Sequence, residues 1–290
     1  MPDETLEQRL RGHIATLSSE IGERNVFRPE ALAAAAEYIR GRWRGQGYEV
    51  RAQEYVVSGI ACENLEVTVT GTRNPSEIVL IGAHYDSVQG SPGANDNGSG
   101  IAGLLEIGRF LADASPPART VRLVAFVNEE PPFFYWGQMG SQVYAKAARA
   151  RRDDIRLMVS LEMLGCFSAE PGSQAYPPLL KHFYPNRGNF IAFVSNLRSI
   201  RALREAVAAF KANSAFPVES LAAPQWVPGV AWSDQLSFWQ QGYQAIMVTD
   251  TAFYRYPYYH TVADTPDKID YPSMARVVAG LQGAVARLTG

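Results

Sequence analysis

Residues 78–86 read IVLIGAHYD, and this short stretch says most about the fold. Its first six residues are apolar or glycine, which is typical of a central strand covered on both faces. The strand runs directly into His84 and Asp86. Residues 92–100, PGANDNGSG, then lead through Asp96 into a segment whose apolar residues recur at helical spacing. A strand, a glycine-rich acidic loop and a helix in this order predict one unit of an α/β fold.

The same alternation of strand and helix continues along the chain. Strands are predicted at 48–57, 64–70, 78–83, 121–127, 157–161, 190–194 and 245–249. Helices are predicted at 6–21, 30–44, 96–111, 141–150, 200–210 and 271–288. This order predicts an α/β fold of three layers, α/β/α, with a mixed, largely parallel central sheet. No repeat or linker divides the chain, so residues 1–290 are expected to form a single domain, and 168–189 a long surface loop near the site.

Length and composition narrow the possible partners. A chain of 290 residues that is 47% hydrophobic can bury one large core, and its net charge of −2 gives no electrostatic reason to bind nucleic acid or an anionic membrane. No apolar run approaches the ~20 residues that a membrane span needs. Residues 1–25 lack the pattern of a signal peptide. We therefore expect a cytoplasmic protein as the sequence stands, or a secreted one if a leader was removed.

Two cysteines, Cys62 and Cys166, occur in the whole chain. Neither stands in a Cys-x-x-Cys pattern, and two residues cannot build a disulfide framework. Buried, small apolar side chains are the first interpretation, and one disulfide between them is the alternative.

Five potential metal ligands are distributed along the chain: His84, Asp96, Glu130, Glu162 and His260. All but the last follow a predicted strand or its loop directly, and His260 follows the strand 245–249 through a longer loop. Ligands of open α/β sheets bind beyond the carboxyl ends of the strands, so these side chains are predicted to converge on one edge of the sheet. Imidazole and carboxylate groups are good zinc ligands.

The charges of these residues favour two zinc ions rather than one. The charges of three carboxylates, two Zn²⁺ ions and a bridging hydroxide sum to zero, whereas a single ion would leave a buried net negative charge. Asp96, in the glycine-rich loop, is the predicted bridging ligand. Glu129, adjacent to the ligand Glu130, is predicted to be a general base that takes a proton from water. Asp86 is the predicted partner of the second ring nitrogen of His84.

The residues resemble the co-catalytic di-zinc aminopeptidases of the bacterial leucyl-aminopeptidase type, a family related to glutamate carboxypeptidase and glutaminyl cyclase. The resemblance covers residues 60–290 and rests on five segments in the family's order. They are His84-x-Asp86, Pro92-Gly93-x-x-Asp96-x-x-Ser99-Gly100, Glu129-Glu130 followed by Gly140-Ser141, Leu161-Glu162-Met163, and Tyr259-His260. Three features depart from the pattern. Glu162 stands where family members commonly have Asp, and Gln235 stands where many have His. The third is an aromatic insertion at residues 131–136, which lengthens the segment between the glutamates and Gly140.

The resemblance implies a sheet like that of the zinc peptidases and a role for each matched residue. His84, Asp96 and Glu162 would bind one zinc, and Asp96, Glu130 and His260 the other. By the same resemblance, Tyr259 would donate a hydrogen bond to the oxyanion of the tetrahedral intermediate. The implied activity is hydrolysis of the N-terminal bond of a peptide with a free amino terminus.

Other functions remain open at this stage. One is a single-zinc acyltransferase similar to glutaminyl cyclase, in which Glu162 would handle protons. Another is a binding module without catalysis, which the complete ligand set disfavours. The aromatic residues of 131–136, together with Trp232, Phe253 and Tyr254, are expected to line a pocket for the first side chain of the substrate, with ordinary core packing as the alternative. The oligomeric state is not predicted.

Overall fold

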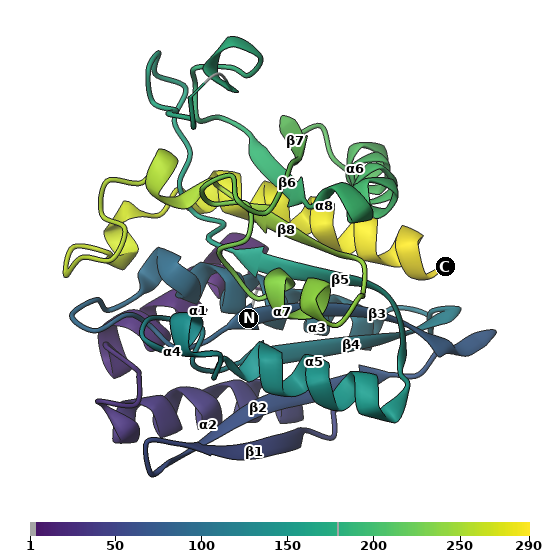
Figure 1. Ribbon diagram of the computed structural model, residues 1–290. Helices are drawn as coiled ribbons and strands as arrows, with labels where there is room; N and C mark the ends of the chain where they lie inside the picture. The colour runs from purple at the N-terminus through teal and green to yellow at the C-terminus, as the bar shows by residue number, and fades with distance from the viewer. Residues whose placement is uncertain (1–3, 179) are drawn as a thin grey trace.

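Within residues 4–178 and 180–290, which the computed structural model describes, eight strands form one sheet in the order β1-β2-β4-β3-β5-β8-β6-β7 (Figure 1). The strands are β1 (Arg51–Val57), β2 (Ile60–Val69), β3 (Asn74–His84), β4 (Arg119–Phe126), β5 (Asp154–Glu162), β6 (Ile191–Ser195), β7 (Val218–Ala222) and β8 (Ala245–Thr249). The helices are α1 (Leu6–Ala15), α2 (Pro29–Gly45), α3 (Gly100–Asp113), α4 (Phe133–Trp136), α5 (Gly140–Arg151), α6 (Ile200–Asn213), α7 (Gln235–Gln240) and α8 (Tyr271–Thr289).

The sheet is mixed, as predicted, and its centre is parallel. Strands β4, β3, β5 and β8 run in one direction, whereas β2 joins β4 and β6 joins β8 in antiparallel pairs. The register pairs His84 with Phe126 at the end of β3, and Glu162 with Thr249 at the end of β5. The carboxyl ends of the four central strands therefore meet at one edge of the sheet, where an α/β fold places its ligands.

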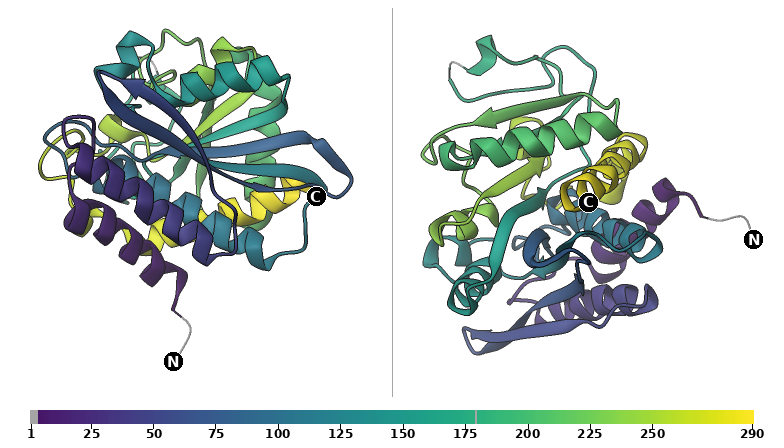
Figure 2. Two further views of the ribbon diagram at one scale, coloured as in Figure 1. Left: turned by 90° about the horizontal axis from the view of Figure 1, so that it is seen from below. Right: turned by 90° about the vertical axis from the view of Figure 1, so that its right-hand side faces the viewer.

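Helices cover both faces of the sheet, which gives the three layers that the pattern predicted (Figure 2). One face packs against α2, α3, α6 and α8, and α1 packs in turn against α3 and α8; together they form the larger core cluster. The other packs against α5 and α7 around Phe126, Tyr144 and Phe238, whose rings contact one another. The predicted helix at 6–21 is split into α1 and a wider turn, η1 (Thr16–Ile21).

Three short elements were not predicted: α4, β7 and α7. Strand β7 has only five residues and includes Glu219 and Ser220, so its apolar pattern is weak. Helix α7 has six residues, too few for a periodic signal. Strand β7 is the edge strand beyond β6, so the sequence pattern predicted a sheet that is one strand too narrow, whereas α7 packs against β5 and β8.

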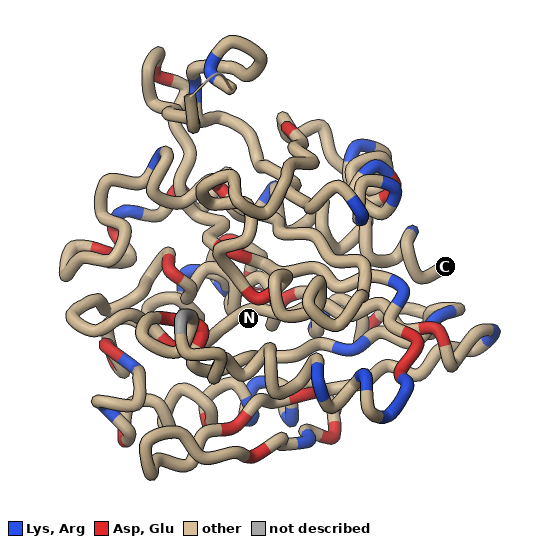
Figure 3. The backbone as a smooth tube through the Cα atoms, viewed as in Figure 1, with Lys and Arg blue, Asp and Glu red and all other residues tan. Residues whose placement is uncertain are grey.

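The surface and the cysteines agree with an ordinary globular chain. Positive and negative residues are interspersed along the chain in the view of Figure 3. Among the described residues, every helix is too short or too polar to cross a bilayer. Cys62 is buried and Cys166 partly buried, and both are free thiols, so the disulfide alternative is wrong for this structure.

Candidate metal centre

The sheet brings the five potential ligands together from three strand ends and two loops. His84 is the last residue of β3 and Glu162 the last residue of β5, while Glu130 follows the end of β4. Asp96 lies in the irregular turn η2 (Ala94–Ser99), which leads from β3 into α3, and His260 lies in the loop after β8. The edge that the strand order predicted is therefore where the side chains meet.

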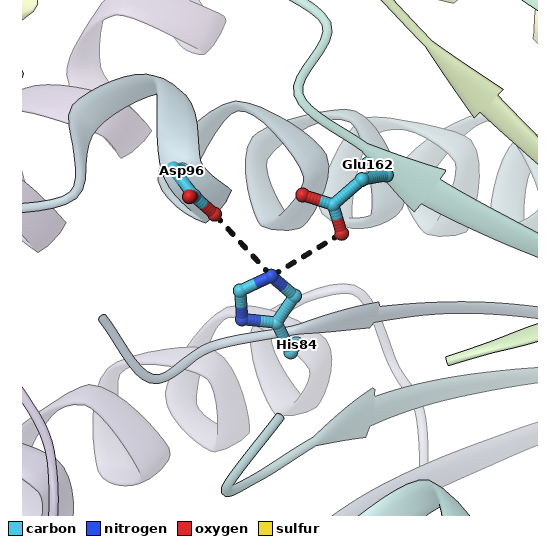
Figure 4. Close-up of side chains that lie close together, drawn as sticks. All are labelled: His84, Asp96 and Glu162. Carbon is cyan, nitrogen blue, oxygen red and sulfur yellow. Dashed lines mark ion pairs between the residues drawn. The ribbon is translucent and has the colours of Figure 1, made fainter. Parts of the chain in front are cut away.

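These side chains form two clusters that share Asp96. In the first cluster, Nε2 of His84 lies 3.4 Å from Oδ1 of Asp96 and 3.3 Å from Oε2 of Glu162 (Figure 4). In the second cluster, Nε2 of His260 lies 3.1 Å from Oδ2 of Asp96 and 3.2 Å from Oε2 of Glu130. The two oxygens of one carboxylate thus face different clusters, which is the geometry of a bridging ligand.

The spacing of the ligand atoms fits zinc. Ligands of a tetrahedral zinc with bonds of about 2.0–2.1 Å stand about 3.3 Å apart, and the four separations above lie within 0.2 Å of that value. Two of the buried atoms, Nε2 of His84 and Oε1 of Glu130, have no hydrogen-bond partner among the described residues. A buried polar atom without a partner is costly, and a metal ion would satisfy both.

The electrostatics of the centre also favour the binding of cations. Burial raises the pKa of Glu129 well above its usual range and that of Glu130 to about 7, and the neighbouring carboxylates add to both shifts. Burial opposes protonation of His84, but Glu162 and Glu129 outweigh it and hold the pKa of His84 well above its usual value. The protein has gathered more negative charge here than its own cations balance, so bound divalent ions would stabilise the ionised carboxylates.

Glu129 is buried next to both clusters, yet it belongs to neither of them. Its Oε2 lies 3.9 Å from Nε2 of His84. The carboxylate of Asp86 accepts hydrogen bonds of 3.2 Å from the backbone N–H groups of both Glu129 and Glu130, so it fixes the end of the segment that presents both acids. The second ring nitrogen of His84 lies 3.2 Å from the backbone oxygen of Asp86 and 3.5 Å from its carboxylate, so the main chain is the nearer partner.

Hydrogen bonds connect the loops that carry Asp96 and His260. The buried carboxylate of Asp264 accepts hydrogen bonds from the backbone N–H groups of Asn95 and Asp96, at 2.8 and 3.1 Å, and from the hydroxyl of Tyr256. Asp264 lies four residues after His260. Its contact with the loop of Asp96 therefore fixes the position of Asp96 relative to His260, two of the three ligands of the second cluster.

The backbone beside the ligands is unusual as well. Asn128, Met163 and His260 have φ values of 59°, 54° and 58°, in the left-handed region that non-glycine residues rarely adopt. One of them precedes Glu129, another follows Glu162, and the third is itself a ligand. Such conformations cluster where a site requires a side chain to be aimed in one direction.

One residue of the site was not recognised from the sequence. Asp234 is fully buried, and its two carboxylate oxygens have no hydrogen-bond partner among the described residues. Burial raises its pKa to about 7, with the carboxylates of Glu162 and Asp86 adding to the shift. The neighbouring Ser233 donates a hydrogen bond of 2.7 Å to Oε2 of Glu162. The local signal of Asp234, an acid before a short helix, is that of an ordinary helix cap.

An apolar cavity opens beside the first cluster. Glu162 and Tyr259 line it, and so do Trp232, Phe253 and Tyr254, as expected for the substrate pocket. None of the described side chains of 131–136 lines it: Phe133 is buried in the larger core, and Trp136 is exposed. Most of the aromatic insertion therefore lies outside this cavity.

Tyr259 and Gln235, the remaining residues singled out from the sequence, occupy different surroundings. The ring of Tyr259 stacks on His260, with centroids 3.8 Å apart, and burial raises the pKa of its hydroxyl, so this group stays protonated. Its role as an oxyanion donor stays a prediction. Gln235, the first residue of α7, is buried and donates to the backbone oxygen of Val230, at 3.0 Å.

Arg24 supports the metal-binding loop from the N-terminal segment. Its guanidinium is fully buried and donates to the backbone oxygens of Tyr85, Pro92 and Gly93 at 2.6, 2.6 and 2.7 Å, besides two oxygens near η1. Burial lowers its pKa to about 10, still above neutral, so the group stays charged. Gly93 has φ of 61°, and a Cβ there would lie 2.5 Å from the backbone oxygen of Asp96, so the loop requires glycine.

Replacing Arg24 with Met is expected to destabilise the protein by about 3–5 kcal/mol, because several buried carbonyl oxygens lose their donor. Urea unfolding of the variant measures the change. Arg28→Met is the matched control, since the Arg28 side chain is 66% exposed. A loss below about 1 kcal/mol for Arg24→Met would contradict this account of the loop.

Comparison with known proteins gives three results. The sequence model described as peptidase family M28 matches residues 64–284. The chain is 38% identical to the uncharacterized protein YfbL of Escherichia coli (strain K12) over 289 residues, which cover 97% of this chain and 88% of that protein. Curated zinc metalloproteases and aminopeptidases also match, and the chain spans less than half the length of each.

Solved structures share the fold. The zinc aminopeptidase BSAP from Bacillus subtilis superimposes with a TM-score of 0.76 at 16% identity, over 97% of this chain and 95% of that one. A glutaminyl cyclase from Fimbriiglobus ruber gives a TM-score of 0.69 at 19% identity, over 99% and 96%. Identities this low establish a common architecture and leave the reaction to the residues of the site.

Proposed function

This chain belongs to peptidase family M28 and is a hydrolase of the metallo-aminopeptidase kind, and from that premise we propose that it removes the N-terminal residue of peptides with two zinc ions. The observation that carries the proposal is the position of Glu129. It is a buried acid beside two complete ligand clusters and is a member of neither. A metal centre with a free carboxylate next to it is the arrangement that hydrolysis requires.

Zinc, when bound, lowers the pKa of water to about 7 and polarises a carbonyl oxygen. The residues of the chain do the rest. Glu129 takes a proton from the attacking water and passes it to the leaving nitrogen. The carboxylate of Asp86 accepts a hydrogen bond from the backbone N–H of Glu129 and so positions this general base. Tyr259, which lines the cavity and whose hydroxyl stays protonated, donates to the developing oxyanion.

The free amino terminus of the substrate is expected to bind among the carboxylates of the centre. The site has an excess of acidic groups, and Glu129 and Glu162 both lie within 4 Å of Nε2 of His84. A peptide whose amino group is blocked cannot supply the positive charge that these acids attract. The preference for N-terminal cleavage follows from this requirement.

Elemental analysis and a substrate panel, applied to one sample, test the function. We expect about two zinc ions per chain, turnover of aminoacyl-arylamides, and no turnover of the N-acetylated forms of the same compounds. One zinc ion per chain together with cyclisation of N-terminal glutamine would instead support the single-zinc acyltransferase, in which Glu162 handles protons. A fully metallated protein inactive on every compound would overturn both enzymatic functions and favour a binding module.

Glu162 decides between the two enzymes and has its own supporting contact. The Ser233 hydroxyl donates to Oε2 of Glu162, the same oxygen that faces Nε2 of His84. Burial raises the pKa of Glu162 overall, although His84 and this hydrogen bond lower it, so a bound cation would hold the carboxylate in the ionised form that a metal ligand needs. We therefore assign Glu162 to the first zinc.

A further inference from the structure

Four residues in register across the sheet connect the metal centre with the far end of the cavity. Glu162 on β5 pairs with Thr249 on β8, Thr249 pairs with Ala192 on β6, and Ala192 pairs with Glu219 on β7. Paired residues on neighbouring strands point to the same face, and all four line the cavity. Adjacent strands lie about 4.8 Å apart, so the backbones at the two glutamates are about 14 Å apart.

The surface of the sheet between the two glutamates, which forms the floor of the cavity, carries small or apolar side chains. The small side chains of Ala192 and Thr249 occupy the middle of the row, and the next row on the same face consists of Met247, Val194 and Leu221. The cavity holds about 820 Å³ of space, part of it open to solvent. The strands that form this floor lie side by side in Figure 1.

Glu219 has no partner among the residues that the structure describes. It is partly buried and makes neither a hydrogen bond nor an ion pair with them. Burial raises its pKa, and within this part of the chain the exposed Lys211 is the one charged side chain that offsets the effect. Its carboxylate is not among the buried polar atoms that lack a partner, so solvent reaches it, and it is available to pair with a cationic ligand in the apolar cavity.

An aromatic wall stands beside this carboxylate. The rings of Tyr176 and Tyr184 stack at a centroid distance of 5.7 Å, and their hydroxyls donate to the backbone oxygens of Pro185 and Ser220. Both tyrosines line the cavity, and Glu219 acts electrostatically on both. A carboxylate next to aromatic faces is a site for a guanidinium or ammonium group.

We propose that the cavity selects an N-terminal residue with a long side chain that ends in a cation, arginine or lysine, and that Glu219 is its partner. This inference rests on the proposed aminopeptidase function. The scissile bond lies at the Glu162 end of the row, and the methylene groups of the side chain lie over Thr249 and Ala192. The cation then reaches Glu219 and the tyrosine wall. A neutral side chain in the same place would cover Glu219 and leave it unpaired, which disfavours it.

Matched pairs of arylamides test the proposal. Arginine and citrulline have nearly the same shape but differ in charge, and lysine and norleucine form a second pair. For the wild-type protein we expect kcat/KM to be about tenfold or more higher for the charged member of each pair. In Glu219→Gln both ratios should fall to near one. Glu54→Gln, which removes an exposed carboxylate on β1, should leave them unchanged.

The outcomes separate this inference from the function on which it rests. Turnover of the neutral compounds with charged-to-neutral ratios near one in the wild-type protein would overturn the role of Glu219 and leave the aminopeptidase standing. Ratios that survive in Glu219→Gln would also overturn it. Absence of turnover with every compound would overturn both proposals. The wild-type ratios require no variant, so the test does not depend on whether Glu219→Gln folds.

Discussion

Glu129→Gln should lower kcat by about a thousandfold while the protein keeps its zinc. Glutamine preserves the shape of the side chain, but its amide cannot take a proton, and a positioned general base typically contributes about 10²–10⁴ in rate. Because Glu129 belongs to neither ligand cluster, the metal content should not change. Elemental analysis and turnover of an aminoacyl-arylamide, measured on one preparation, check both parts.

Two comparisons make the result specific. Glu130→Gln removes a member of the second cluster, so it should lose zinc as well as turnover. Glu205→Gln changes a carboxylate that is 58% exposed on α6 and should alter neither quantity. If Glu129→Gln retained activity within tenfold of wild type, Glu129 would not be the base.

Asp96→Asn should reduce the zinc content from about two ions to fewer than one and abolish measurable turnover. Asp96 contributes one oxygen to each cluster, so a single substitution weakens both positions at once. Asparagine keeps the size of the side chain but removes the negative charge and one of the two oxygen ligands. The loss of turnover should be at least as large as for Glu129→Gln, since no activated water remains.

Zinc binding also stabilises the folded protein, which gives a second readout. Added zinc should raise the Tm of the metal-free wild-type protein and have little effect on Asp96→Asn. Asp267→Asn is the control, because that carboxylate is 67% exposed and lies outside both clusters. Retention of two zinc ions by Asp96→Asn would show that the clusters do not share this residue.

The central fold and the ligand set could be predicted because their signals are local. Strands such as β3, β4, β5 and β8 contain apolar runs, and a polar residue that follows such a run marks the carboxyl edge. His84, Glu130 and Glu162 were found in this way. The helices α2, α3 and α8 repeat apolar residues at helical spacing over fourteen residues or more.

Residues whose function depends on distant contacts could not be predicted. Arg24 looks like any surface arginine until the loop at 85–93 folds over it. Asp234 becomes part of the site only because α7 packs beside β5. Glu219 lies on a short edge strand with a weak pattern, and its relation to Glu162 depends on the register of three strand pairs. Register and packing of this kind are tertiary properties.

The Arg24 contact has a consequence for the order in which the chain folds during synthesis. Its acceptors Tyr85, Pro92 and Gly93 are 61, 68 and 69 residues further along the chain. At about 5–20 residues per second, they leave the ribosome on the order of 3–14 s after the arginine. The guanidinium therefore stays hydrated during that interval, because burial without those carbonyls would be too costly. Arg24 therefore reaches these native contacts only after the loop at 85–93 has been made, although the arginine itself is made earlier.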